Sequence, residues 1–162
     1  MEEKMLINPY DQLNDFYCFG CSSKNPIGLK LSFSETESGL KSIWQPTIEF
    51  SGYSNILHGG IQSTLLDEIA AWTIYIKLDT AGVTSKLEIE FLKPMVIQNE
   101  RPILLETEIL SVSDRLATIK GKIINFEGQL CSQSMATFAI FPRNVAQRKF
   151  HFPGKDAFYK NM

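Results

Sequence analysis

The sequence predicts an α+β fold in which an antiparallel sheet of about six strands wraps around one long central helix. Apolar residues recur at helical spacing between Ile61 and Ile76. Strand-length runs of residues lie on both sides of this segment, a pair before it and the others after it. A helix that is apolar on most of its sides is buried only if the sheet curls around it.

The strands are predicted from alternation of apolar and polar residues. Residues 29–34 alternate in this way, and residues 40–44 form their partner after a turn at 37–39. After the helix, Leu87, Ile89 and Phe91 alternate with charged residues, which predicts a half-buried antiparallel strand over 83–92. Three further runs joined by turn signals are 103–112, 116–126 and 130–141.

The helix is apolar around most of its circumference. One continuous face consists of Ile61, Leu65, Ile69, Trp72 and Ile76. Much of the remaining surface is filled by Leu66, Ala70, Ala71 and Ile74. This pattern is typical of a helix covered on most sides.

The first turn of this helix is unusual. His58, Gly59 and Gly60 occupy positions where Ser, Thr, Asp or Asn is the ordinary cap. Glycines leave the free backbone N–H groups at the positive end of the helix dipole open to approach. A ligand oxygen with partial negative charge fits such a position.

Two acidic residues follow on the same helix. Asp67 lies at about 12 Å or less from the glycines by helical rise. A carboxylate on an apolar helix is costly to bury unless it is paired or functional. The alternative is that Asp67 and Glu68 lie on an exposed stripe and that a plain loop leads into the helix.

The segment from Leu57 to Ile61, with Leu65-Leu66-Asp67-Glu68 after it, resembles the signature of the hotdog-fold acyl-CoA thioesterases. The branch that it resembles includes phenylacetyl-CoA thioesterases and mammalian mitochondrial thioesterase-superfamily proteins. Two further stretches resemble this family, residues 18–29 with Cys18-Phe19-Gly20-Cys21, and residues 89–94. The resemblance covers most of residues 16–141. It implies the hotdog fold, in agreement with the burial pattern.

The resemblance implies roles for the helix start and the acid. The Gly59 N–H, helped by Gly60, would hydrogen-bond the thioester oxygen and stabilise the oxyanion. Asp67 would act as general base on water or as a nucleophile that forms a mixed anhydride. Glu68 is the alternative carboxylate.

Three more residues enter the site through the resemblance. His58 is expected to organise the loop and the carbonyl site, the alternative being a purely structural histidine. Thr84 matches a position where related enzymes place Ser or Thr to orient the attacking water. Related enzymes often carry Asn or Gln six residues before the histidine, where this chain has Gly52. Asn55 is the residue that substitutes for it in our interpretation.

The expected function is therefore hydrolysis of an acyl-CoA thioester, with a small or medium acyl or aryl-acyl group, to free acid and coenzyme A. Two alternatives share the fold, namely a non-catalytic acyl-CoA-binding or regulatory protein and a hydratase or dehydratase. Gly52 favours the first alternative mildly, whereas the retained Gly59, Gly60 and Asp67 argue against it. The sheet leaves an edge strand, so we expect a homodimer or, as in much of the family, a homotetramer.

Composition narrows the class of protein. The 162 residues are 44% hydrophobic and 21% charged, which fits one globular domain over 1–162 with its core over about 16–141 and a C-terminal extension over 142–162. The net charge of −2 argues against a nucleic-acid partner. No stretch has the apolar length of a membrane span, and the N-terminus lacks a signal-peptide pattern, so a cytoplasmic protein is expected.

The C-terminal extension carries an excess of basic residues, which are Arg143, Arg148, Lys149, Lys155 and Lys160. We expect a solvated segment. The alternative is that some of these cations contact the phosphates of coenzyme A.

The cysteines are expected to be reduced, partly buried thiols. Cys18 and Cys21 form a C-x-x-C pair, and Cys131 lies alone in a strand-like run. A structural zinc site wants four protein ligands, and the further candidates, His58 and His151, are both far away in the sequence. A redox pair is disfavoured because thioredoxin-like motifs open a helix after a strand. We therefore expect neither a metal nor another cofactor.

Overall fold

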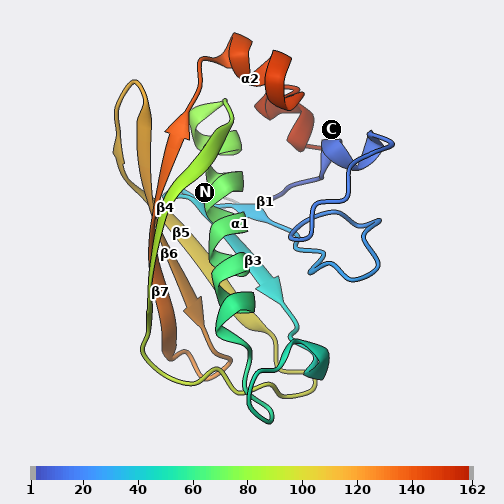
Figure 1. The fold of residues 1–162 in the computed structure, drawn as a ribbon, viewed down its shortest axis with the longest axis vertical. Helices are drawn as coiled ribbons and strands as arrows, with labels where there is room; N and C mark the ends of the chain where they lie inside the picture. Colours follow the sequence, from blue (N-terminus) through green and yellow to red (C-terminus); the bar gives the residue numbers. More distant parts are fainter. Residues whose placement is uncertain (1–2, 161–162) are drawn as a thin grey trace.

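The computed structural model describes residues 3–160, in which a seven-stranded antiparallel sheet curves around one long helix, α1 (Gly59–Leu78) (Figure 1). The strand order is β1-β2-β3-β5-β6-β7-β4. The strands are β1 (Lys4–Met5), β2 (Ser34–Glu35), β3 (Leu40–Trp44), β4 (Gly82–Phe91), β5 (Ile103–Val112), β6 (Leu116–Ile124) and β7 (Leu130–Ile140). The second helix is α2 (Arg143–Phe150), and short 3₁₀ turns are η1 (Pro9–Gln12), η2 (Ile48–Phe50) and η3 (Lys155–Phe158). The predicted hotdog fold is confirmed.

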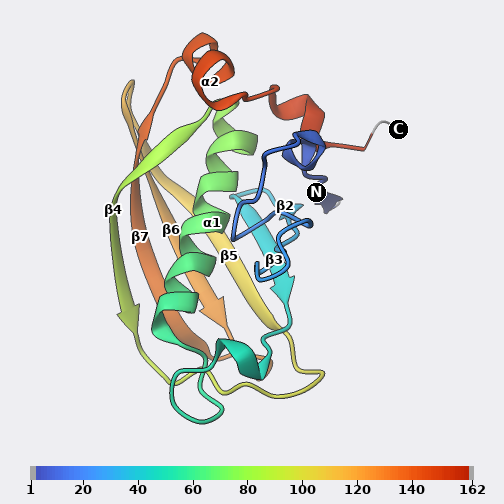
Figure 2. The same ribbon diagram turned by 45° about the vertical axis from the view of Figure 1, so that its right-hand side comes forward.

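The helix is buried between two layers. Figure 2 shows the curved sheet on one side of α1 and the N-terminal segment on the other. Leu65, Leu66 and Ile69 are fully shielded from solvent, and Trp72 packs against Phe33 with ring centroids 4.5 Å apart. Because apolar side chains surround the helix on most sides, both layers are needed to bury it.

The predicted strand over residues 29–34 is wrong except at its end, where Ser34 begins β2. Lys30 has a φ of 53°, a left-handed conformation that interrupts an extended chain. The N–H groups of Leu29 and Leu31 donate to the carbonyl oxygens of Phe19 and Gly20 instead of to a sheet. The alternation still reports burial, since Leu29 and Leu31 point inward. The short β1, which pairs with β2, was not predicted.

The C-terminal segment adds to the core instead of lying wholly in solvent. Phe152 and Phe158 are buried, and both rings stack on Tyr75 of α1. Arg143 forms an ion pair with Asp79 at 3.0 Å, at the end of α1 opposite to Gly59 (Figure 1). The buried residues thus extend past the expected limit at residue 141, and the expectation of a solvated segment fails for its aromatic residues.

Strand β4 forms one edge of the sheet and pairs only with β7. Leu87 and Ile89 are partly buried against the core, as predicted. Phe91 was predicted on the same half-buried face but is 55% exposed, because its ring lies beside Gly59 at the open end of the helix; Val83 is 44% exposed. No helix in residues 3–160 has both the length and the apolar content needed to cross a bilayer.

Candidate active site

His58 forms the cap of helix α1. Its Nδ1 accepts a hydrogen bond from the Gly60 N–H at 2.8 Å, and its backbone N–H donates to the Phe50 carbonyl oxygen at 2.9 Å. Because Nδ1 accepts this bond, Nε2 is the ring nitrogen that remains for a ligand. A Cβ on Gly60 would lie 3.0 Å from that Nδ1, so a side chain here would push the His58 ring aside. His58 therefore orders the start of the helix, and the Gly60 N–H is already occupied.

The Gly59 N–H, at the start of the helix, keeps its hydrogen-bonding capacity. It has no backbone acceptor within residues 3–160, as expected for the first residue of a helix. Beside it lies an open hollow of about 360 Å³, lined by Glu49, Phe50, Ser51, His58, Gly60 and Ile61. The ring of Phe91 borders the other side, 3.4 Å from where a Gly59 Cβ would be. The arrangement leaves the Gly59 N–H free to donate at the positive end of α1.

Asp67 faces β4, two turns further along α1. The Thr84 hydroxyl donates to Asp67 Oδ1 at 2.7 Å, which brings together two residues that the sequence analysis singled out. Neither residue is buried, and Asp67 forms no ion pair within the described chain. One carboxylate oxygen is thus fixed by a hydroxyl, and the other remains available to a water or a substrate.

Gly59 and Asp67 do not converge within one protomer. Eight residues of α-helix separate them, which corresponds to about 12 Å. A carbonyl bound at the Gly59 N–H at hydrogen-bond distance is therefore out of reach of Asp67 on the same helix. The structure supplies two halves of a site at separate points along α1.

Asn55 and Gly52 lie in the loop before the helix. Asn55 adopts a left-handed conformation, with φ of 59°, and its carbonyl oxygen accepts from the Ile97 N–H at 2.7 Å. Asn tolerates this conformation better than most residues, which explains its presence in the turn. Its exposed side chain forms no hydrogen bond within residues 3–160. Gly52 lies against the His58 ring, where a Cβ would be 3.3 Å from Cδ2.

Glu68 points away from Asp67, toward Cys18 and Cys21. The Cys18 thiol lies 3.4 Å from Glu68 Oε1, and burial together with the nearby Cys18 raises the pKa of Glu68 to about 8. A hydrogen bond from the Cys21 thiol lowers the pKa of Cys18 to about 6, whereas the pKa of Cys21 is raised. The sequence analysis did not find this grouping, because Glu68 was weighed only as a substitute for Asp67. The signal in the sequence was that Glu68 directly follows Asp67 and therefore points to another side of the helix, toward a different environment.

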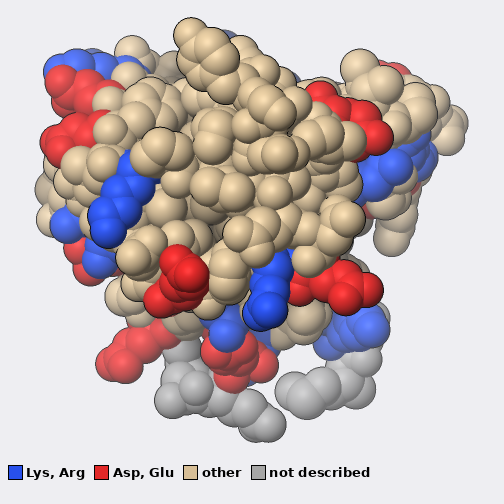
Figure 3. All heavy atoms as spheres, turned by 90° about the horizontal axis from the view of Figure 1, so that it is seen from below, with Lys and Arg blue, Asp and Glu red and all other residues tan. Residues whose placement is uncertain are grey.

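The end of the molecule that holds the first turn of α1 is mainly uncharged. Figure 3 views this end and shows a broad uncharged area with acidic and basic side chains around its margin. Exposed apolar residues of the neighbouring loops are Ile48, Tyr53, Leu92 and Val96. Such a surface suits apolar ligands or another protein chain.

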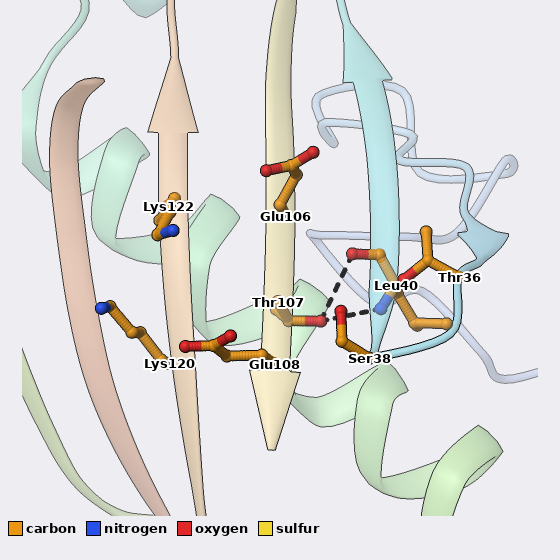
Figure 4. A pocket seen from close by; sticks show the side chains of 8 residues that line it. All are labelled: Thr36, Ser38, Leu40, Glu106, Thr107, Glu108, Lys120 and Lys122. Carbon is orange, nitrogen blue, oxygen red and sulfur yellow. Dashed lines mark hydrogen bonds between the residues drawn. The ribbon is translucent and has the colours of Figure 1, made fainter. Parts of the chain in front are cut away.

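A hollow on the outer face of the sheet is a weaker candidate for the functional site than the start of α1. It measures about 170 Å³, and Figure 4 shows Glu106 and Glu108 of β5 near Lys120 and Lys122 of β6. The strand register pairs each glutamate with one of these lysines. Opposite charges that face each other leave little net field for an anionic ligand. The candidate site is therefore placed at α1.

Comparison with known proteins identifies the family of this chain. The sequence model of the thioesterase superfamily matches residues 54–132, which include Asn55, His58, Gly59, Gly60, Asp67 and Thr84. A protein of Saccharolobus solfataricus named "Putative esterase" is 31% identical over 120 residues, which are 72% of this chain and 76% of that protein. The chain belongs to the thioesterase superfamily.

Solved structures place this thioesterase-superfamily chain in the same fold. A Streptococcus mutans protein solved bound to acetyl CoA has a TM-score of 0.65 and 16% identity, with 82% of this chain and 98% of that chain covered. A thioesterase superfamily protein also has a TM-score of 0.65, with 23% identity over 72% of this chain; this chain spans 56% of that longer one. These likenesses establish the architecture around α1.

Proposed function

We propose that this chain hydrolyses an acyl-CoA thioester, carrying a small or medium acyl or aryl-acyl group, to free acid and coenzyme A. The observation that carries the proposal is the 2.7 Å hydrogen bond from Thr84 to Asp67, on the same helix whose first N–H, that of Gly59, has no backbone acceptor. Membership of the thioesterase superfamily supports the reaction class. The acetyl CoA bound to the Streptococcus mutans protein supports the ligand class.

The proposed active site forms between two copies of the chain. Along β4, Thr84 lies beside Asp67, and Phe91 lies beside Gly59. If two β4 edges pair antiparallel about a two-fold axis near Leu87, the Phe91 end of one strand lies next to the Thr84 end of the other. The Gly59 half of one protomer then faces the Asp67 half of its partner, and the separation of about 12 Å along one helix is no longer an obstacle.

In this mechanism the Gly59 N–H donates to the thioester oxygen and stabilises the negative charge that develops there. Asp67 of the partner subunit, oriented by its own Thr84, takes a proton from water as the water oxygen attacks the carbonyl carbon. The C–S bond breaks, and the coenzyme A thiolate leaves and receives the proton held by Asp67. His58 keeps the helix start in shape without exchanging a proton.

Direct attack by Asp67 is the other route to the same products, through a mixed anhydride. A single turnover in heavy-oxygen water tests for this route. Label found in the Asp67 side chain after turnover indicates an anhydride that water opens at the Asp67 carbon. Label confined to the released acid is expected both of Asp67 as a base and of an anhydride that water opens at the acyl carbon.

The experiment that tests the proposal is release of free thiol from a panel of acyl-CoA and aryl-acyl-CoA thioesters. Wild type is compared with Asp67→Asn and with Asp114→Asn, a control at an exposed turn. Hydrolysis by wild type and by the control, with loss in Asp67→Asn, is the expected result. Tight binding of coenzyme A without hydrolysis of any thioester would establish the acyl-CoA-binding alternative, which Gly52 beside His58 favours.

A further inference from the structure

Three possible metal ligands converge on the side of α1 that faces the N-terminal segment. The sulfur atoms of Cys18 and Cys21 and a carboxylate oxygen of Glu68 all lie within 4.8 Å of one another. The Cys18 Sγ to Glu68 Oε1 distance is 3.4 Å. The cysteines come from the loop that covers the helix, whereas Glu68 comes from the helix itself, so the cluster joins two layers of the fold.

The backbone around the cluster is built to hold these atoms together. Gly20 lies between the cysteines, and a Cβ on it would be 2.6 Å from Cδ and Oε2 of Glu68. Hydrogen bonds fix the loop on both sides, from the Ser22 N–H to the Cys18 carbonyl oxygen at 3.1 Å and from the Asn8 side-chain amide to the Cys21 carbonyl oxygen at 3.0 Å. The loop thus admits the carboxylate only because residue 20 has no side chain.

The cluster gathers acidic groups without a cationic side chain. None of the ion pairs within residues 3–160 involves Glu68. Cys21 is 6% exposed, so its sulfur is shielded from water. A shielded carboxyl and two thiols without a cationic side chain either keep their protons or release them to a bound metal cation.

The donor set and its spacing fit zinc. Thiolates favour zinc over magnesium or calcium, and the C-x-x-C spacing is typical of zinc ligands. A tetrahedral ion with Zn–S near 2.3 Å and Zn–O near 2.0 Å places a sulfur and an oxygen ligand about 3.5 Å apart. The 3.4 Å between Cys18 Sγ and Glu68 Oε1 agrees with this edge of a tetrahedron.

We propose that Cys18, Cys21 and Glu68 bind one Zn²⁺ ion, with water as the fourth ligand, and that the ion clamps the N-terminal segment onto α1. Binding displaces the thiol protons to solvent, so that two thiolates and the carboxylate coordinate the metal. The sequence-based expectation of no metal rested on the histidines as the additional ligands. The fold supplies Glu68 as a third protein ligand, one fewer than a closed structural site has, so water completes the tetrahedron. The site is separate from the Gly59 and Asp67 halves described above.

The test uses the full chain, reduced and freed of metal, titrated with Co²⁺ and then Zn²⁺. We expect one Co²⁺ per chain, a thiolate-to-cobalt absorption band, tetrahedral visible bands, and displacement by Zn²⁺. Cys21→Ser should abolish the thiolate band or leave a weak one, and Glu68→Gln should weaken binding by about tenfold or more. Cys131→Ser is the matched control and should bind as wild type does. Saturating Zn²⁺ should raise the melting temperature of wild type by about 5–10 °C and leave that of Cys21→Ser unchanged.

Several results would overturn the proposal. Wild type alone decides the main point, even where a variant fails to fold, because absence of a thiolate band in the reduced protein excludes the site. Unchanged affinity in Glu68→Gln removes the carboxylate from the ligand set. A band that is lost in Cys131→Ser but kept in Cys21→Ser moves the metal elsewhere. Oxidation of Cys18 and Cys21 to a disulfide, with no metal bound by the reduced form, makes the pair a redox site instead.

Discussion

Asp67 and Glu68 are neighbours in the sequence, yet their side chains lie in different environments beside α1. Asp67 faces the edge strand β4, where a hydroxyl fixes one of its oxygens and the other is accessible. Glu68 faces a closed loop, where two thiols surround it and burial raises its pKa to about 8. The same functional group thus serves an open position on one side of the helix and an enclosed one on the other. Position around the helix, more than residue type, decides which chemistry a carboxylate can perform.

The largest expected effect separates the two carboxylates by activity. Asp67→Asn should lower kcat/KM by about 10²- to 10⁴-fold, because it removes the proton acceptor. Glu68→Gln should change kcat/KM little in protein that remains folded, since its side chain points away from the proposed reaction centre. Steady-state kinetics, with folding checked by circular dichroism, measures both. An equal loss in the two variants would contradict the division of roles.

Alanine substitutions of Gly20 and Gly59 compare the stability of the enclosed side, at Glu68, with that of the open side, at the start of α1. Gly20→Ala should cost about 1–2 kcal/mol of unfolding free energy, because the new Cβ must displace Glu68 from Cys18. Gly59→Ala should be neutral or stabilising by up to about 1 kcal/mol, since its Cβ meets Phe91 at an ordinary 3.4 Å. Its activity should nevertheless fall, because the methyl group crowds the free N–H. Urea unfolding and thiol-release assays on both variants give the comparison.

A smaller effect is expected from the hydroxyl that orients Asp67. Thr84→Val keeps the shape of the side chain and removes the 2.7 Å hydrogen bond. We expect kcat to fall by about tenfold, or roughly 1.4 kcal/mol in activation free energy. Thr84→Ser is the matched control and should retain most of the activity. If the valine variant equals wild type in kcat, Thr84 has no part in positioning the acid.

The reactivity of Cys18, on the enclosed side of α1 beside Glu68, should depend on pH. In the reduced, metal-free protein, Cys18 should react with iodoacetamide in proportion to its thiolate fraction, with half-maximal rate near pH 6, the value to which the Cys21 hydrogen bond lowers its pKa. The rate should fall below that pH as the thiol becomes protonated. Cys21→Ala removes the hydrogen-bond donor and should move the midpoint to higher pH. Mass spectrometry of the alkylated cysteine measures each rate.

Periodicity found the elements whose backbone is regular. The spacing from Ile61 to Ile76 identified α1, alternation identified β4, and strand-length runs between turn signals identified β3, β5, β6 and β7 to within a few residues. It failed over residues 29–33 because burial alternates there although the backbone turns at Lys30. Local patterns report which side chains face inward, and hydrogen-bond partners distant in sequence decide whether a strand forms.

Of the groups of functional side chains beside α1, one was likewise predicted from the sequence and one was not. Resemblance selected Thr84 and Asp67, and the structure places them in contact. The grouping of Glu68 with the cysteines could not be predicted, because 50 residues separate Cys18 from Glu68. Only the docking of the N-terminal segment on α1 brings them together. Spacing rules detect ligands that are near in sequence, and folded topology supplies the others.

The exposed edge of β4 has a consequence for how activity should depend on the amount of protein. If each reaction centre needs Gly59 from one copy and Asp67 from another, a separated chain contains all the residues and no complete centre. Specific activity would then fall on dilution as pairs dissociate, and a mixture of Gly59-deficient and Asp67-deficient chains would recover part of what each lacks. The unpaired side of one strand would thus couple turnover to the concentration of the chain itself.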